Sequence, residues 1–246
     1  MADIDADLIV AALAEKYIAG ATAVVLASPP EGPVWGVLVP SRRVFAAWTV
    51  LREAMPRTGG WPIVIGNVPR LPSLDRDARP VETILASAAE VDPREWARQR
   101  AGEDPDRFAS PSGDWPATVR HGEAFRVLSE LGRQAEPAVI ALAPTALPHQ
   151  VPAHLRFGGW SDCPPPEVHV AVFREWHERF GAEPVVMTKD TLELLVRRPV
   201  SSREEALELA RFQRPYDGNL VDQGVDSVEV LAARLLGNPR WFFRWD

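Results

Sequence analysis

The first third of the chain has apolar residues at helical spacing in some segments and in short continuous runs in others. Apolar positions over 4–19 and over 43–55 follow the spacing of amphipathic helices. Two β-type runs, at 23–27 and 34–39, flank a turn rich in Pro and Gly, which predicts a hairpin. A further apolar run at 61–65 predicts a buried strand. Together these elements predict an N-terminal α/β region.

Residues 67–118 interrupt this pattern. Seven prolines divide the stretch into short pieces, because Pro lacks a backbone N–H and clashes with the preceding turn of a helix. Two short helices are expected, at about 80–90 and 93–101, and the run from Gly102 to Trp115 is dense in turn-forming residues. We therefore expect a long, irregular, Pro-rich insert.

The C-terminal half returns to a regular pattern of strands and helices. Ser202 and Glu205 have the spacing of a capping box, which predicts that a helix begins there. The expected elements are a helix at 120–134, a strand at 138–143, a helix at 167–181, strands at 184–188 and 191–197, helices at 202–214 and 227–236, and a strand at 240–245. From 138 onward, and apart from one extra helix, this is the order of a split βαβ unit. The sequence therefore predicts an α+β protein, with an N-terminal α/β region at 1–135 and a C-terminal ferredoxin-like βαββαβ domain at 136–246.

The C-terminal half also carries a series of short motifs. They are Gly158-Gly159-Trp160, Cys163-Pro164, Arg174-Glu175-Trp176, Phe180-Gly181-Ala182-Glu183, Asp190-Thr191-Leu192-Glu193-Leu194, Arg198-Pro199, Arg203-Glu204-Glu205-Ala206-Leu207, Asp222-Gln223-Gly224 and the terminal Trp241-Phe242-Phe243-Arg244-Trp245-Asp246. In this order they resemble a bacterial family known only as domain of unknown function 4253, over about residues 138–246. Tyr216-Asp217-Gly218-Asn219 stands where that family has a Cys-Pro-Asp segment. The resemblance implies no activity, cofactor or catalytic residue.

Composition narrows the classes of partner. The net charge is −7, and the 25 Arg and 2 Lys residues are interleaved with acids rather than grouped, so no basic stripe exists to follow a nucleic-acid backbone. The single cysteine excludes internal disulfides and Cys-based zinc cages. No early apolar stretch is long enough to span a bilayer, so no membrane association is expected. The bias toward Arg, Pro and Ala is typical of a GC-rich bacterial genome, and we expect a cytoplasmic protein.

Aromatic side chains supply the first binding candidates. The chain has nine Trp residues, and Trp is strongly enriched at binding hot spots. Alternation in the last strand places Trp241, Phe243 and Trp245 on one face, which core packing would explain. The alternative is that Trp245 and Asp246 protrude and anchor a partner protein, together with Trp160.

Amide side chains supply the second set. Gln213 lies near the centre of the apolar face of helix 202–214, where a buried amide needs hydrogen-bond partners. It either bonds to neighbouring backbone groups or lines a polar pocket together with Asp222 and Gln223.

Catalytic candidates have little motif support. The sequence contains no Gly-x-Ser-x-Gly elbow, Walker loop or strand-linked Gly-x-Gly-x-x-Gly. Cys163 would need a neighbouring His and a cationic environment to lower the pKa of its thiol. The carboxylate candidates are Asp222 and Glu193, and alternation directs Glu193 away from Leu192 and Leu194, to a face that we expect to be exposed.

A metal site can be drawn from Cys163, His154 and His169. Their spacing matches no established ligand motif, so neither a metal nor a cofactor is expected.

These observations favour a non-enzymatic protein-interaction module, one that neutralises or regulates another bacterial protein. The alternative is a hydrolase that uses Cys163, or Asp222 and Glu193, in a cleft between the two halves. A third hypothesis, a small-molecule sensor, has no motif behind it. An exposed aromatic patch would favour the first hypothesis, whereas converging polar groups in one concave pocket would favour the second.

Overall fold

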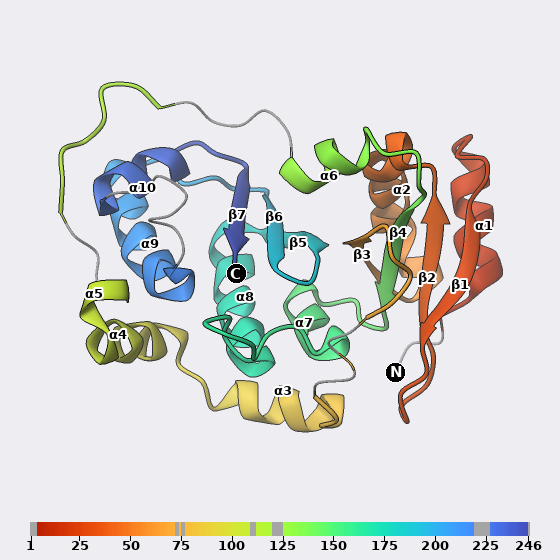
Figure 1. Cartoon of the computed structure of the whole chain (residues 1–246), viewed down its shortest axis with the longest axis horizontal. Helices are drawn as coiled ribbons and strands as arrows, with labels where there is room; N and C mark the ends of the chain where they lie inside the picture. Colours follow the sequence, from red (N-terminus) through yellow and green to blue (C-terminus); the bar gives the residue numbers. More distant parts are fainter. Residues whose placement is uncertain are drawn as a thin grey trace.

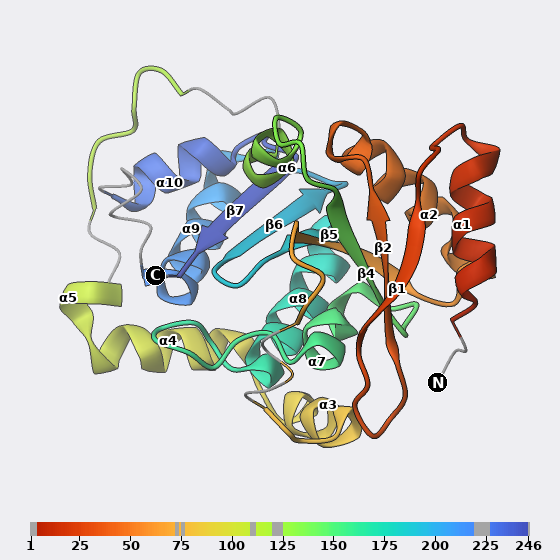
Figure 2. The ribbon, with the colours of Figure 1, turned by 45° about the vertical axis from the view of Figure 1, so that its right-hand side comes forward.

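Seven strands form one mixed sheet in the computed structural model of the chain (Figure 1). The structure describes residues 4–71, 74, 77–108, 112–119, 125–218 and 227–245. The strands are β1 (Thr22–Ala27), β2 (Val34–Val39), β3 (Trp61–Gly66), β4 (Ala138–Ala143), β5 (Ala182–Met187), β6 (Thr191–Val196) and β7 (Arg240–Arg244). Their order across the sheet is β1-β2-β4-β3-β5-β6-β7, so β1 and β7 form the two edges (Figure 2). Neighbouring strands are antiparallel except β3 and β5, which are parallel.

Helices cover both faces of this sheet. They are α1 (Ala6–Glu15), α2 (Val44–Thr58), α3 (Val81–Ala89), α4 (Pro93–Glu103), α5 (Pro105–Phe108), α6 (Arg126–Leu131), α7 (Val151–Leu155), α8 (Pro166–Phe180), α9 (Arg203–Tyr216) and α10 (Val228–Leu235). Several begin where a side chain caps the first turn: Ser202 accepts the N–H of Glu205, as the capping-box spacing predicts, and Asp92 caps α4. Among the described residues, no helix has the length and apolar character needed to cross a membrane.

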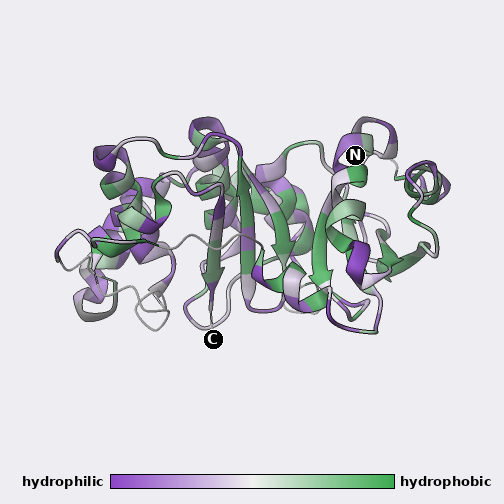
Figure 3. Ribbon diagram, turned by 90° about the horizontal axis from the view of Figure 1, so that it is seen from above, coloured by the Kyte–Doolittle hydropathy of each residue, from purple (hydrophilic) through white to green (hydrophobic). Residues whose placement is uncertain are grey.

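The two faces of the sheet have separate hydrophobic cores, and alternate side chains of β4 belong to one core or the other. Val139, Ala141 and Ala143 pack with α7 and α8, whereas Ile140 and Leu142 pack with α1 and α2. Every residue of β4 is buried, as expected of a central strand covered on both sides. Figure 3 shows the central strands of the sheet as a mostly hydrophobic layer in the middle of the molecule. The result is a three-layer α/β/α arrangement.

The ferredoxin-like topology expected for the C-terminal half is not confirmed. That topology would place the 138–143 strand beside β6 and β7, but β4 lies between β2 and β3, and β7 pairs with β6. The observed sheet differs from the ferredoxin-like one because β3, a strand from the N-terminal part of the chain, lies between β4 and β5 at the centre of the sheet. One continuous sheet therefore crosses the boundary expected at 135–136. The coarser expectation, a mixed α and β protein, is confirmed.

Polar contacts fix β3 and α2 against β5. Glu183 on β5 is buried and forms ion pairs with Arg52 of α2 at 2.7 Å and with Arg197 at 2.9 Å. The Arg52 guanidinium lies 4.1 Å from the ring centroid of Trp61, whose Nε1 donates a hydrogen bond to the Pro184 carbonyl at 3.3 Å. These contacts hold the parallel pair in register next to the site described below.

Candidate functional site

A pocket of about 430 Å³ opens where the parallel strands β3 and β5 end. Ile65 to Val68 line it from the end of β3, and Met187 to Asp190 line it from the end of β5. The two strands are paired at a single position, Val64 with Val186. In mostly parallel α/β sheets, ligands bind in the crevice beyond the carboxyl ends of neighbouring strands, where the strand order reverses, and the single parallel pair of this sheet offers a comparable position. We call this crevice the strand-end pocket.

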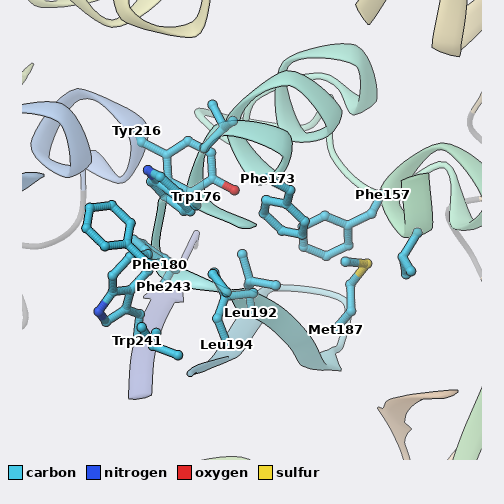
Figure 4. Close-up of a cluster of buried hydrophobic side chains, with 14 of the residues drawn as sticks. Phe157, Phe173, Trp176, Phe180, Met187, Leu192, Leu194, Tyr216, Trp241 and Phe243 are labelled. Carbon is cyan, nitrogen blue, oxygen red and sulfur yellow. The ribbon is translucent and has the colours of Figure 1, made fainter. Parts of the chain in front are cut away.

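One wall of the strand-end pocket is aromatic. Phe157 and Trp160, which follow α7, both line it, and their rings meet edge to face with centroids 5.1 Å apart. Leu71, Leu155 and Met187 add apolar surface, and Figure 4 shows Met187 beside Phe157. The side chain of Trp160 is half-buried, so part of its ring remains available to a ligand.

The rim of the pocket carries polar and charged groups. Arg70 and Lys189 line it and are both exposed. Lys189 forms no ion pair within the described part of the chain. Asp190 also lines the pocket, but its Oδ1 accepts hydrogen bonds from the hydroxyls of Thr188 and Thr191 at 3.1 and 3.0 Å. Among the described lining residues, the exposed Lys189 therefore offers a positive charge at the rim, whereas the Asp190 carboxylate is partly occupied by hydrogen bonds within the turn.

The loop that carries Trp160 has an unusual backbone. Gly158, Gly159 and Ser161 have φ angles of 111°, 80° and 46°, and the Cys163 N–H closes the turn onto the Trp160 carbonyl at 2.9 Å. In this conformation Trp160 lines the pocket and Cys163 is buried. Positive φ angles at consecutive positions are costly for residues other than Gly, which explains the Gly-Gly pair.

Behind this loop, three polar side chains form a buried chain of contacts. The Cys163 Sγ lies 3.4 Å from His169 Nε2, and His169 Nδ1 lies 2.5 Å from the Tyr216 hydroxyl. Rings of Phe157, Phe173 and Trp245 surround the imidazole, with centroids between 5.0 and 6.0 Å away. Burial lowers the pKa of His169 to about 3 and raises that of Tyr216 well above its usual range. At neutral pH the imidazole and the phenol are therefore both uncharged.

This geometry bears on the hydrolase hypothesis for Cys163. A nucleophilic cysteine needs a base within hydrogen-bond reach and a third group to orient that base, and His169 and Tyr216 occupy these positions. However, all three groups are buried, and the low pKa of His169 disfavours the imidazolium that would stabilise a thiolate. Catalysis by Cys163 thus stays a prediction.

We expect Gly158→Ala to destabilise the protein. A Cβ at this position would lie 2.1 Å from the Pro164 carbonyl oxygen and 2.7 Å from His169 Cδ2, so the loop and the imidazole must move. Gly159→Ala is the matched control, because it has a positive φ but no atom within 4 Å of its Cβ, and its cost is about 1–2 kcal/mol. Chemical denaturation should show a loss at Gly158 at least about 2 kcal/mol larger than at Gly159, since overpacking adds its own cost. Equal losses would contradict a tight contact between Gly158 and His169.

Glu193 was expected to be exposed, but the structure shows that it is buried. It is 2% exposed on β6, and its Oε1 accepts the backbone N–H groups of Arg126 and Val127, at 2.6 and 3.3 Å, where α6 begins. Its Oε2 has no hydrogen-bond partner among the described residues. Burial raises the pKa of Glu193 to about 7. Helix α6 covers this face of β6. The alternation of side chains along the strand does not predict that a helix packs there.

The other binding candidates lie away from the strand-end pocket or outside the described residues. Trp245 is fully buried, and its Nε1 donates to the Tyr216 carbonyl at 3.3 Å, as the core-packing interpretation predicts. Gln213 is buried on α9, and its Nε2 has no partner within the described chain. Asp222, Gln223 and Asp246 lie outside the described residues.

No group of three or more His, Cys, Asp and Glu side chains is placed to hold a metal ion in the described ranges. Of the three residues of the metal site considered from the sequence, Cys163 and His169 are in contact. His154 instead lines a cavity beside the β1–β2 hairpin, to which neither of the other two contributes.

The aromatic loop and the His169 contacts belong to a recognisable segment. Residues 139–246 match the family described as a domain of unknown function (DUF4253). This confirms the resemblance inferred from the motifs. No curated protein and no solved structure matches the chain.

The strand-end pocket combines the DUF4253 segment with residues that precede it. Trp160 and Lys189 come from the matched segment, whereas Gly66, Asn67 and Arg70 come from the N-terminal part of the chain. Of the described lining residues, only Trp160 was predicted from the sequence to be a binding residue. One available signal was the presence of Lys189 in a chain that otherwise uses Arg at nearly every basic position.

Proposed function

We propose that the protein binds a small organic anion with a flat apolar body in the strand-end pocket. The observation that carries this proposal is the pocket at the carboxyl ends of β3 and β5, with Trp160 in its wall and Lys189 at its rim. Its volume of about 430 Å³ falls within the range of about 300–1,000 Å³ of small-molecule sites. An aromatic wall suits a planar group, and an ammonium at the rim suits a carboxylate, sulfonate or phosphate.

This proposal keeps the non-enzymatic binding role inferred from the sequence and changes the kind of partner. A protein-interaction module was expected to expose its aromatic anchors, but Trp245 is buried and Trp160 lines a pocket. A small ligand accounts for the position of Trp160 more directly than a partner protein does. We also propose, from composition, that the protein acts in a bacterial cytoplasm.

A pair of fluorescent probes tests the proposal. Anilinonaphthalene sulfonate carries an anionic group on aromatic rings, and N-phenylnaphthylamine has the same rings without the sulfonate. We expect Lys189→Met to weaken the sulfonate about tenfold, which corresponds to about 1.4 kcal/mol, and to leave the neutral probe unaffected. Trp160→Ala should weaken both probes, because it removes the aromatic wall.

Matched controls are available in the same chain. Lys16, the only other lysine, follows the end of α1, away from the strand-end pocket, so Lys16→Met should leave both titrations unchanged. Trp115→Ala removes a tryptophan that does not line the pocket. Equal effects of the two lysine variants, or no effect of Trp160→Ala on either probe, would contradict the proposal.

A further inference from the structure

A second cavity, of about 230 Å³, lies beside the loop of the β1–β2 hairpin and next to Pro144, which follows the end of β4. It is lined by the hairpin loop, by the start of β2, by Val81 at the start of α3, and by His154 and Arg156 of the α7 segment. Figures 1 and 2 show this hairpin loop extending toward α3. It shares no lining residue with the strand-end pocket.

The charges in its wall pair with each other. The Arg156 guanidinium is 4% exposed and lies 2.6 Å from the Glu31 carboxylate. It also donates to the carbonyls of Arg79 and His154, at 3.1 and 3.2 Å. The backbone of Arg156 is left-handed, with φ at 48°. Because this cation and this carboxylate neutralise each other, the wall offers no net charge to a ligand.

Two polar groups of this wall have no hydrogen-bond partner among the described residues, namely the Oε2 atom of Glu31 and the imidazole of His154. The His154 side chain is only 7% exposed, and neither ring nitrogen has a hydrogen-bond partner in the described part of the chain. Burial and the neighbouring Arg156 lower the pKa of His154 to about 4. A neutral imidazole presents one N–H donor and one nitrogen acceptor. Glu31 Oε2, in the same wall, is buried as well. Buried polar groups of native proteins are rarely left without a partner, so this oxygen and the neighbouring imidazole together point to a bound molecule.

The rest of the wall is apolar and partly flat. Val34, Trp35, Val81 and Pro33 line the cavity, and proline contributes no backbone N–H donor. The volume is below the range of about 300–1,000 Å³ that is usual for drug-sized ligands, so the occupant is smaller than such a molecule.

We infer that this cavity is a second binding site, which takes a small uncharged heteroaromatic molecule through a hydrogen bond to His154. The paired charges exclude preference for an ion, Trp35 provides a surface for a ring, and the imidazole selects a ring that carries nitrogen. The site is independent of the organic-anion site proposed above.

Two isosteric probes separate the hydrogen bond from simple apolar filling. Benzimidazole carries a ring N–H and a ring nitrogen, and indene has the same shape in carbon alone. We expect calorimetry on the full chain at pH 7.5 to give benzimidazole an affinity at least tenfold higher than that of indene. Benzimidazole should not displace N-phenylnaphthylamine from the strand-end pocket.

Variants at His154 complete the test. His154→Leu should reduce the affinity for benzimidazole to that for indene, whereas His154→Gln, which keeps a donor and an acceptor, should retain it within about threefold. His149→Leu is the control, because this half-buried histidine does not line the cavity. Equal affinity of the two probes for the native chain would overturn the inference even if the Leu variant did not fold. Displacement of N-phenylnaphthylamine, or unchanged binding by a folded His154→Leu protein, would overturn it as well.

Discussion

Replacing Trp245 with alanine is expected to lower the free energy of unfolding by about 3–5 kcal/mol, the range for removing a buried aromatic side chain. Trp245 is fully buried and packs against His169, Tyr216 and Phe243, with ring centroids 5.4 to 6.2 Å away. Its loss leaves a cavity beside the Cys163–His169–Tyr216 contacts and removes the bond from Nε1 to the Tyr216 carbonyl. Urea or thermal denaturation measures the change.

Trp160→Ala is the matched comparison, because it removes the same side chain from a half-buried position. It should cost clearly less stability while weakening binding in the strand-end pocket. If Trp245→Ala cost no more stability than Trp160→Ala, the burial of Trp245 would be contradicted, and its role as a surface anchor would regain support.

Glu193 is expected to make stability fall as pH rises. Its pKa is about 7 in the folded protein, against 4.5 for an ordinary glutamate. Between these two values the folded protein keeps a proton that the unfolded chain releases, so the free energy of unfolding decreases as pH rises. A shift of about 2.5 pH units at about 1.36 kcal/mol per unit gives a loss of about 3 kcal/mol, which is complete above pH 7.

Glu193→Gln should remove this part of the pH dependence, because its amide oxygen can accept the same backbone N–H groups without a buried charge. Subtracting the variant's stability curve from that of the native protein, between pH 4.5 and 8, isolates the contribution of Glu193. Glu53→Gln, at an exposed position of α2, is the control and should leave the slope unchanged. Parallel curves for the native and Glu193→Gln proteins would show that Glu193 titrates like an exposed carboxylate.

The elements of the fold could be predicted closely from local patterns. Residues 34–39 and 138–143 form strands with the expected bounds, and α9 begins after Ser202 as its capping box requires. These features follow from the periodicity of apolar residues and from hydrogen bonds between residues a few positions apart. Both kinds of signal are complete within a short stretch of sequence.

Other expectations depended on which segments meet in space. The strand at 138–143 was expected beside the C-terminal strands but pairs with β2 and β3. Glu193 was expected to be exposed but is covered by α6. The contact between His169 and Tyr216 joins positions 47 residues apart, so no local spacing in the sequence predicts it.

The candidate site likewise has features that local sequence predicts and features that depend on the tertiary structure. The sequence by itself determined the strands and helices and the family resemblance of the C-terminal half, and it made Trp160 a candidate for binding, because each of these depends on residue types within one segment. Only the tertiary structure decided the strand-end pocket, since β3 and β5 are separated by more than 100 residues and their parallel pairing creates the crevice. Alternation along a strand specifies which side chains share a face but not which strand lies alongside, and the neighbour is selected by the packing of the whole sheet.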